Sequence, residues 1–531
     1  MTTASRFLIA SALACFLITP PQTLAQWPPG DGMPVADRAG EQTQPKIHPT
    51  ADGGCYISWF DNAGGGYDVY LQRLDAAGNE QWTSNGILIA DRSFSSTEDY
   101  GLDVDDAGNA LLAFRDDRDG NIRITVAKVA PDGTLAWGPN GVQVTTPTED
   151  VLSPRIGATT GGGCVVGWTT IIPSGQAAVG LQKLDAAGNA LWTTSVTLAD
   201  SGDGNFMLSA IHTSDNDSVV FSWVRSGAEF WSPKHLWAQK IAADGTLLWD
   251  PNHVRVYDDG SLQFGYFPEF VPDGGGGAVF GWYYIVGNDL DCAAQHILAD
   301  GSEAFAHNGA AVSTLASQLR VSPAVCYDPP TEYIYMFWTE TDSNQNDRGT
   351  YGQKLDATGN RMWGDSGVVL VPLGDQDIWS VCTVPYADGA IALWLSSSAF
   401  NQDVVQAARL DRDGNQVWTP SPMNVTPTVS GKSRLTATLS VDGTTLAAWM
   451  DARAGDYDIY AQNIFGDGTM GTCPGDLDFN GVIDLSDLAQ LLSNYGTTSG
   501  ATYTDGDLDA DGDVDLSDLA ALLAVYGESC Q

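Results

Sequence analysis

Basic residues are scarce in this sequence. Its 531 residues include 24 lysines and arginines against 66 aspartates and glutamates, which gives a formal net charge of −42. Such a charge disfavours binding to nucleic acid or to an anionic membrane and favours cations. Long hydrophobic runs are also missing, because the one marked apolar segment, Phe7–Thr19, is too short to span a bilayer. We therefore expect neither a nucleic-acid partner nor a membrane span.

The apolar segment near the N-terminus has the features of an export signal. Arg6 precedes it, Pro20 and Pro21 follow it, and the small-residue site Thr23-Leu24-Ala25 comes next. This order is typical of a secretory signal peptide. We predict a signal peptide over residues 1–25 and a secreted or cell-surface location after cleavage before Gln26.

What the sequence does contain is a repeat of 54 to 59 residues that fills most of the chain. Each copy holds short β-branched and aromatic segments bounded by Gly, Asn and Asp, which is the pattern of strands and turns. An aromatic residue ends the second strand of every copy: Trp59, Phe114, Trp168, Trp223, Trp282, Trp338, Trp394 and Trp449. A second aromatic column follows the third strand: Trp27, Trp82, Trp137, Trp192, Trp249, Phe305, Trp363 and Trp418. The fold class predicted is mainly β, an eight-bladed β-propeller over residues 26–471.

The two ends of the repeat array complement each other. The last copy has three strands, whereas the N-terminal segment Gln26–Asp37 matches the fourth-strand segment Gln81–Asp91 of the first copy. An N-terminal strand that completes the last blade would close the ring and leave no free sheet edge.

Loop lengths differ between the two faces of the predicted ring. The loop after the second strand is short in the first blade and long in the fourth (225–234) and sixth (339–350) blades. Variable loops concentrate on the binding face of a propeller. This face is acidic, and Trp231 is one of its aromatic candidates.

Few first-strand residues could support catalysis. A glycosidase needs two carboxylates that flank one glycosidic bond, and first strands offer Asp103 and Asp105 in the second blade and Glu269 in the fifth. These blades are separated around the ring, which argues against an acid pair. His48 and His212 share a first-strand position in the first and fourth blades, and we expect them to pack. We therefore assign no catalytic residue.

The turn at residues 74–86, LDAAGNEQWTSNG, resembles the tryptophan-docking turns of eight-bladed quinoprotein dehydrogenases. In that family a tryptophan near a glycine packs between blades. Because no vicinal cysteine pair is present for the quinone, we interpret the turn as structural.

Five cysteines lie in the repeats. Cys55 and Cys164 occupy the same second-strand position in blades that are not neighbours, so we expect buried thiols. Cys326 and Cys382 lie at similar positions in adjacent blades, where either a bridge or two thiols would fit. The pairing of Cys292 is left open.

The composition changes at the C-terminus, where residues 473–531 contain twelve acids and no lysine or arginine. Two copies with a period of 31 residues, GDLDFNGVIDLSDLAQLLSNYG and GDLDADGDVDLSDLAALLAVYG, each consist of a twelve-residue calcium loop and a helix. The ligands predicted at loop positions 1, 3, 5, 7, 9 and 12 are Asp476, Asp478, Asn480, Val482, Asp484 and Asp487, then Asp507, Asp509, Asp511, Asp513, Asp515 and Asp518. Val482 and Asp513 would contribute backbone carbonyls. We predict two calcium ions.

The segment after each loop is predicted to be an amphipathic helix that a glycine, Gly496 or Gly527, terminates. We expect each apolar stripe to pack against the other: Leu485, Leu488, Leu491, Leu492 and Tyr495, and Leu516, Leu519, Leu522, Leu523 and Tyr526. In such a two-fold arrangement the ends of the module meet, which predicts a disulfide between Cys473 and Cys530.

This duplicated loop and helix, residues 472–531, resembles a type I dockerin. The resemblance implies calcium-dependent docking onto a cohesin-type domain, with loop positions 10 and 11, here Leu485-Ser486 and Leu516-Ser517, at the interface. The apolar residue at position 10 differs from the commoner hydroxyl pair.

Together these features favour a secreted, non-catalytic propeller that binds or displays a ligand and attaches to a cohesin-type partner. The alternative is a carbohydrate-active propeller, a glycoside hydrolase or lyase, delivered to a polysaccharide-degrading complex. Dockerins are often attached to such enzymes, which keeps this alternative open and makes carbohydrate a second partner class.

Overall fold

Strands alternate with tight turns along most of the chain, as the repeat predicts. The computed structural model describes residues 27–28, 30–94, 97, 100–249, 253–287, 289–316, 318–471, 475–478, 482–498, 501, 503–508 and 512–528. The predicted signal peptide and several predicted site residues lie outside the described residues: Cys473, Asn480, Asp509, Asp511 and Cys530.

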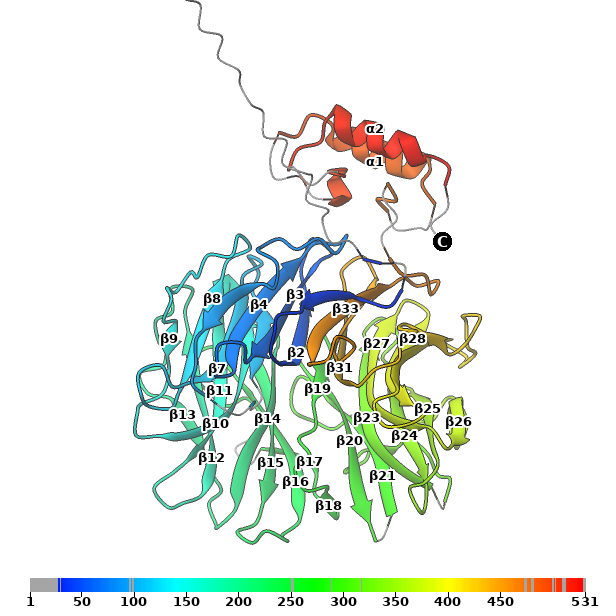
Figure 1. Ribbon diagram of the computed structural model, residues 1–531. Coiled ribbons are helices and arrows are strands. Elements are labelled where there is room, and N and C mark those ends of the chain that lie inside the picture. Colours follow the sequence, from blue (N-terminus) through cyan, green and yellow to red (C-terminus); the bar gives the residue numbers. More distant parts are fainter. Residues whose placement is uncertain are drawn as a thin grey trace, which may run out of the picture.

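The strands form eight separate antiparallel sheets around one axis (Figure 1). The first four blades are β2 (Gln42–Pro49), β3 (Cys55–Asp61), β4 (Asp68–Leu74), β5 (Ile87–Ala90); β6 (Gly101–Val104), β7 (Ala110–Asp116), β8 (Arg123–Val129), β9 (Val142–Gln143); β10 (Asp150–Thr159), β11 (Gly163–Ile171), β12 (Ala177–Leu184), β13 (Val196–Leu198); and β14 (Asn205–Thr213), β15 (Val219–Ser226), β16 (Lys234–Ile241), β17 (Val254–Tyr257). The next three are β18 (Ser261–Leu262), β19 (Phe270–Pro272), β20 (Ala278–Val286), β21 (Asp289–Ile297), β22 (Ala310–Ala311); β23 (Gln318–Asp328), β24 (Tyr333–Asp342), β25 (Arg348–Leu355), β26 (Val368–Gly374); and β27 (Asp377–Tyr386), β28 (Gly389–Ser397), β29 (Asp403–Asp411), β30 (Met423–Asn424). The eighth is β31 (Lys432–Leu439), β32 (Thr445–Asp451), β33 (Asp458–Ile464) and β1 (Met33–Ala36). The predicted eight-bladed propeller is confirmed.

The N-terminal strand closes the ring. β1 pairs antiparallel with β33, with Met33 opposite Ala461 and Pro34 opposite Tyr460. In Figure 1 the dark blue β1 lies beside the orange β33. The fifth blade departs from the four-strand pattern, because β18 and β19 both pair with β20.

The first aromatic column forms the core between blades. All eight of its members are buried, with at most 1% of their surface exposed. The spacing of the column therefore reflects one large side chain for each blade.

The second column joins each blade to the next. Trp27 donates its indole N–H to the carbonyl of Ala76, 3.0 Å away, in the turn after β4. Six further tryptophans make the same bond to the equivalent turn of the following blade: Trp82, Trp137, Trp192, Trp249, Trp363 and Trp418. The interpretation of the turn as structural is supported by these contacts.

Substituting the glycine of this turn should show how much the inter-blade contact contributes. Gly78 has φ +85°, and an added Cβ would lie 2.8 Å from the Trp27 ring, whereas Gly443 has φ +86° and no atom within 4 Å of an added Cβ. We expect both Gly→Ala variants to lose about 1–3 kcal/mol from backbone strain, and Gly78→Ala to lose more because Trp27 must also move. Urea unfolding of the two variants measures the difference, and equal losses would contradict it.

The cysteines of the repeats are free thiols. Cys55, Cys164, Cys292 and Cys326 are buried, and Cys382 is half-buried. Cys326 lies 3.4 Å from the Thr383 hydroxyl, and Cys382 donates to the carbonyl of Leu435 instead of forming a bridge. The buried thiols expected at Cys55 and Cys164 are confirmed.

Two helices follow the propeller, α1 (Leu485–Asn494) and α2 (Leu516–Val525), with a 3-10 turn η2 (Tyr503–Asp505) between them. They lie beside each other above one face of the propeller (Figure 1). No helix in the described part of the chain is long and apolar enough to cross a bilayer.

Candidate functional site

The first acidic loop brings its carboxylates together. Asp476, Asp478 and Asp487 each place one oxygen within 4.8 Å of the others. Asp487 is fully buried and accepts the backbone N–H of Leu477 at 2.6 Å and of Asp484 at 2.8 Å. The loop therefore wraps around its last carboxylate, as a twelve-residue calcium loop does.

The second loop repeats this arrangement with one difference. Asp513, Asp515 and Asp518 form its convergent group, so the carboxylate of Asp513, and not only its predicted carbonyl, faces the cluster. Asp518 is fully buried and accepts the N–H of Leu508 at 2.7 Å. Asp507 accepts the N–H of Gly512 at 2.9 Å.

Both groups fit a calcium ion. Their donors are hard oxygens, and the module contains no lysine or arginine that could neutralise them. Burying ionised carboxylates together without a counter-charge is costly. The described ligands that would hold the ions are Asp476, Asp478, Val482, Asp484 and Asp487, and Asp507, Asp513, Asp515 and Asp518. A bound cation would supply the missing positive charge.

The loop acids also start the helices. Asp484 and Asp515 are N-caps that accept the N–H of Ser486 and Ser517, each at 2.7 Å, and Asp487 and Asp518 complete capping boxes. Gly496 and Gly527 have φ +93° and +87° directly after the helices, which confirms the predicted glycine terminators.

The expectation that whole apolar stripes pack together is wrong. Leu491 and Leu522 are buried and Leu488 and Leu519 partly so, but the other members are exposed: Leu485, Leu492, Tyr495, Leu516, Leu523 and Tyr526. The loops fill the remaining core, because Leu477, Ile483, Tyr503 and Val514 join the same cluster. The outer half of each stripe consequently faces solvent.

Each loop is bonded to the end of the opposite helix. Ile483 donates to the carbonyl of Glu528 and accepts from Gly527. In the same way Val514 donates to Thr497 and accepts from Gly496. The module therefore has an internal two-fold arrangement in which the two acidic loops depend on each other.

The module also touches the propeller. Ala77, in the turn after β4, is fully buried and belongs to the same apolar cluster as Leu477 and Leu491. This turn is also the one that receives the Trp27 indole.

A second group of polar side chains lies on the first strands. His48, Asp103 and His212 occupy one level, because each pairs with the second-strand residue three positions before its column aromatic. His48 Nε2 lies 2.9 Å from Asp103 Oδ1, and the Ala158 N–H donates to Asp103 Oδ2 at 2.7 Å. His48 therefore has a carboxylate partner that the sequence did not predict, whereas His212 packs against Phe270 as expected.

The two histidines have opposite electrostatic environments. Burial disfavours the charged form of His48, but the hydrogen bond and charge of Asp103 outweigh it and raise the pKa of His48. Burial dominates at His212 and lowers its pKa, although the charges of Glu269 and Asp103 act in the other direction. Groups whose environments separate their pKa values are typical of functional sites.

The expectation that Asp103 and Glu269 do not form one acid pair stays a prediction. Both Asp103 and Glu269 act on His212, because first strands from every blade face one axis. Comparing positions relative to the aromatic column would have placed His48, Asp103 and His212 at one level. Asp105 has a different role, since it pairs with Lys128 at 2.7 Å.

A separate cavity of about 350 Å³ lies along the first strands of the fifth to eighth blades. Glu269 is exposed in it, and first strands of the sixth to eighth blades form the opposite wall with Val325, Val381, Thr383 and Thr436. Phe270 links the two parts, because its ring packs edge-on against His212 at 4.8 Å.

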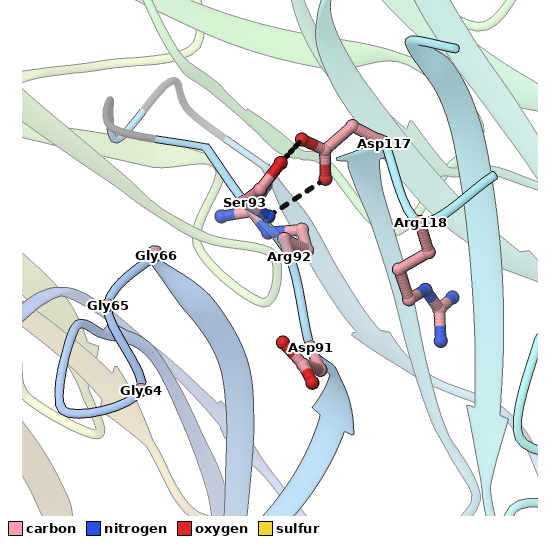
Figure 2. Close-up of a pocket in the computed structure, with 8 residues that line it drawn as sticks. All are labelled: Gly64, Gly65, Gly66, Asp91, Arg92, Ser93, Asp117 and Arg118. Atoms are coloured by element: carbon pink, nitrogen blue, oxygen red, sulfur yellow. Dashed lines mark hydrogen bonds between the residues drawn. The ribbon is translucent and has the colours of Figure 1, made fainter. Parts of the chain in front are cut away.

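A larger hollow of about 700 Å³ lies between the first two blades. Figure 2 shows its lining residues, Gly64, Gly65, Gly66, Asp91, Arg92, Ser93, Asp117 and Arg118. Arg92 donates to the carbonyls of Tyr67 and Arg115, and burial lowers its pKa to about 10. Arg118 is bonded to Asp116 at 2.9 Å. Arg92 thus links the first two blades and Arg118 is paired within the second, so both cations are engaged and we assign the hollow no ligand.

No protein-family model and no curated protein matches the sequence. Among solved structures, a polysaccharide lyase described as an ulvan lyase is 10% identical, with 85% of this chain and 98% of that chain covered and a TM-score of 0.43. A prolyl oligopeptidase B from Galerina marginata is 11% identical, with 77% and 55% covered and a TM-score of 0.41. A Hadza microbial sialidase is 10% identical, with 77% and 76% covered and a TM-score of 0.33. The function is therefore argued from the chain's own residues.

Proposed function

We propose that the chain is an exported propeller that binds or displays a ligand and is attached to a cohesin-type domain by a calcium-loaded, dockerin-like module. The observation that supports this most is the convergence of three carboxylates in each loop, within 4.8 Å and without a basic residue in the module. Two metal-dependent loops that share one small core suit a detachable attachment module.

The outer face of the module supplies a docking surface. Leu485 and Leu516 are 68% and 67% exposed, and each stands beside a serine at the start of its helix. Exposed apolar residues grouped beside a built site are typical of protein interaction surfaces. The internal two-fold places Leu485-Ser486 and Leu516-Ser517 in equivalent positions, so either copy could meet the partner.

Attachment should depend on calcium and on these two leucines. We expect the full-length protein to capture a cohesin-type domain from the secreted and surface fractions of its source with calcium, and to lose it in chelator. Asp487→Asn combined with Asp518→Asn should reduce capture at least ten-fold, because each removes a buried ligand. Leu485→Asp with Leu516→Asp should abolish capture while calcium binding, measured by calorimetry, persists.

Asp505→Asn is the matched control, since it removes one charge from the module outside both loops. Two results would contradict the proposed attachment. One is capture that persists in chelator, and the other is a loss of capture in Asp505→Asn as large as in the Asp487→Asn, Asp518→Asn double variant.

A carbohydrate-active propeller is the second candidate. The cavity beside Glu269, together with the histidine pair of opposite pKa shifts, favours it. Release of new reducing ends or unsaturated ends from a polysaccharide, lost in Glu269→Gln, would support an enzyme. Binding without release would favour the non-catalytic propeller.

A further inference from the structure

An exposed aromatic patch lies where the fourth and fifth blades meet. Trp231 is 79% exposed and Phe264 61%, and the rings of Phe230 and Phe264 are 4.5 Å apart. Lys234 is buried beneath them, with its ammonium 5.5 Å from the Phe264 ring and hydrogen bonds to the carbonyls of Phe230 and Ser232. Such fixed cation–π contacts hold the rings in place.

One segment runs from this patch into the channel. Phe264 stands at its outer end, and Tyr266, Phe267 and Glu269 line the channel cavity. Phe270 then ends the segment against His212. The segment follows the connection between blades, on the face that carries the variable loops. Residues 264–270 therefore join the patch to the cavity, and we call the patch and the cavity together the track.

The track has two chemically different sides. Aromatic and aliphatic side chains line the patch and the wall at Val325 and Val381. Glu269 offers a carboxylate that accepts hydrogen bonds inside the cavity, and Phe270, which also lines it, contacts His212. A pocket that is mostly apolar with a few convergent polar groups is the usual form of a ligand site.

We infer that this track binds a neutral carbohydrate chain, an inference that rests on the proposed binding role of the propeller. The C–H faces of sugar rings stack on exposed aromatic rings, and sugar hydroxyls donate to the Glu269 carboxylate. A net charge of −42 disfavours an anionic ligand. A purely apolar ligand would leave the carboxylate of Glu269 desolvated without a partner.

The test uses the full-length protein with calcium. Affinity electrophoresis against soluble β-glucan, xylan, mannan and galactan is followed by calorimetry with neutral oligosaccharides of the polymer that retards it. We expect at least one polymer to bind, and Trp231→Ala, Phe264→Ala and Glu269→Gln each to weaken binding about ten-fold. Phe400→Ala is the matched control, because Phe400 is 93% exposed on a loop of the seventh blade, and it should bind as the wild type does.

Several outcomes would overturn the inference. These are no retardation by any of the polymers, equal losses in Phe400→Ala and Trp231→Ala, or unchanged binding in both Trp231→Ala and Phe264→Ala. Loss of cohesin capture instead of sugar binding in Trp231→Ala would assign the patch to a protein partner. Sugar binding that persists in Asp487→Asn with Asp518→Asn would separate the track from the attachment module and support the inference independently of it.

Discussion

Deleting residues 27–37 should lower the melting temperature of the propeller by roughly 10 °C. The deletion removes β1, which is the outer strand of the last blade and pairs with β33. It also removes the buried side chains of Trp27, Met33 and Val35, each of which stabilises the fold by about 1.5–3 kcal/mol. The sum is comparable with the whole stability of a typical domain, and an open ring would expose a free strand edge.

Calorimetry on the chain that begins after the predicted signal peptide measures this effect. Val35→Ala and Pro34→Ala provide a matched pair within β1, because Val35 is buried and Pro34 is exposed. We expect Val35→Ala to be the more destabilising of the two. A deletion variant that melts with the wild type would refute closure by β1.

The propeller could be predicted from the sequence because its information is local and repeated. Each blade contains one buried aromatic residue, such as Trp59 or Trp449, at the same position of a four-strand pattern. The closing strand could be recognised for the same reason, since Gln26–Asp37 restates the segment around Trp82. In the described part of the chain, the split first strand of the fifth blade departs from this local pattern.

The channel group could not be predicted in this way because it depends on ring closure. His48, Asp103 and His212 are far apart along the chain, and only the shared axis brings their first strands together. Part of the aromatic track could be predicted from the sequence, because the length of its loop places Trp231 on the variable face. The contribution of Phe267 could not, because it depends on the irregular segment before β19.

The C-terminal module likewise has features that the sequence predicts and features that it does not. Ligand positions such as Asp487 follow from spacing alone, since the calcium loop is a local motif. Which helix residues are buried could not be predicted from spacing, because two ten-residue helices share a small core with Ile483 and Val514 from the loops. Leu485 is therefore free for a partner and unnecessary for the core.

Calcium removal should unfold the C-terminal module and leave the propeller intact. Asp487 and Asp518 are fully buried beside other carboxylates, and repulsion between these charges opposes folding when no cation is bound. Because a ligand that binds only the folded state stabilises it, calcium at 100 times its dissociation constant should add about 2.7 kcal/mol for each independent site. Hydrogen exchange of the full chain, read at residues 485–494 and 516–525, measures the effect.

The reciprocal bonds between the loops make this unfolding cooperative. Ile483 of the first loop is tied to Gly527 after α2, and Val514 of the second loop to Gly496 after α1, so neither half can lose its loop structure without freeing the end of the other helix. Asp487→Asn alone should therefore raise exchange in both α1 and α2, whereas Asp505→Asn should raise it in neither. Exchange that rises only in α1, or helices that stay protected in chelator, would show that the two halves fold separately or without the ions.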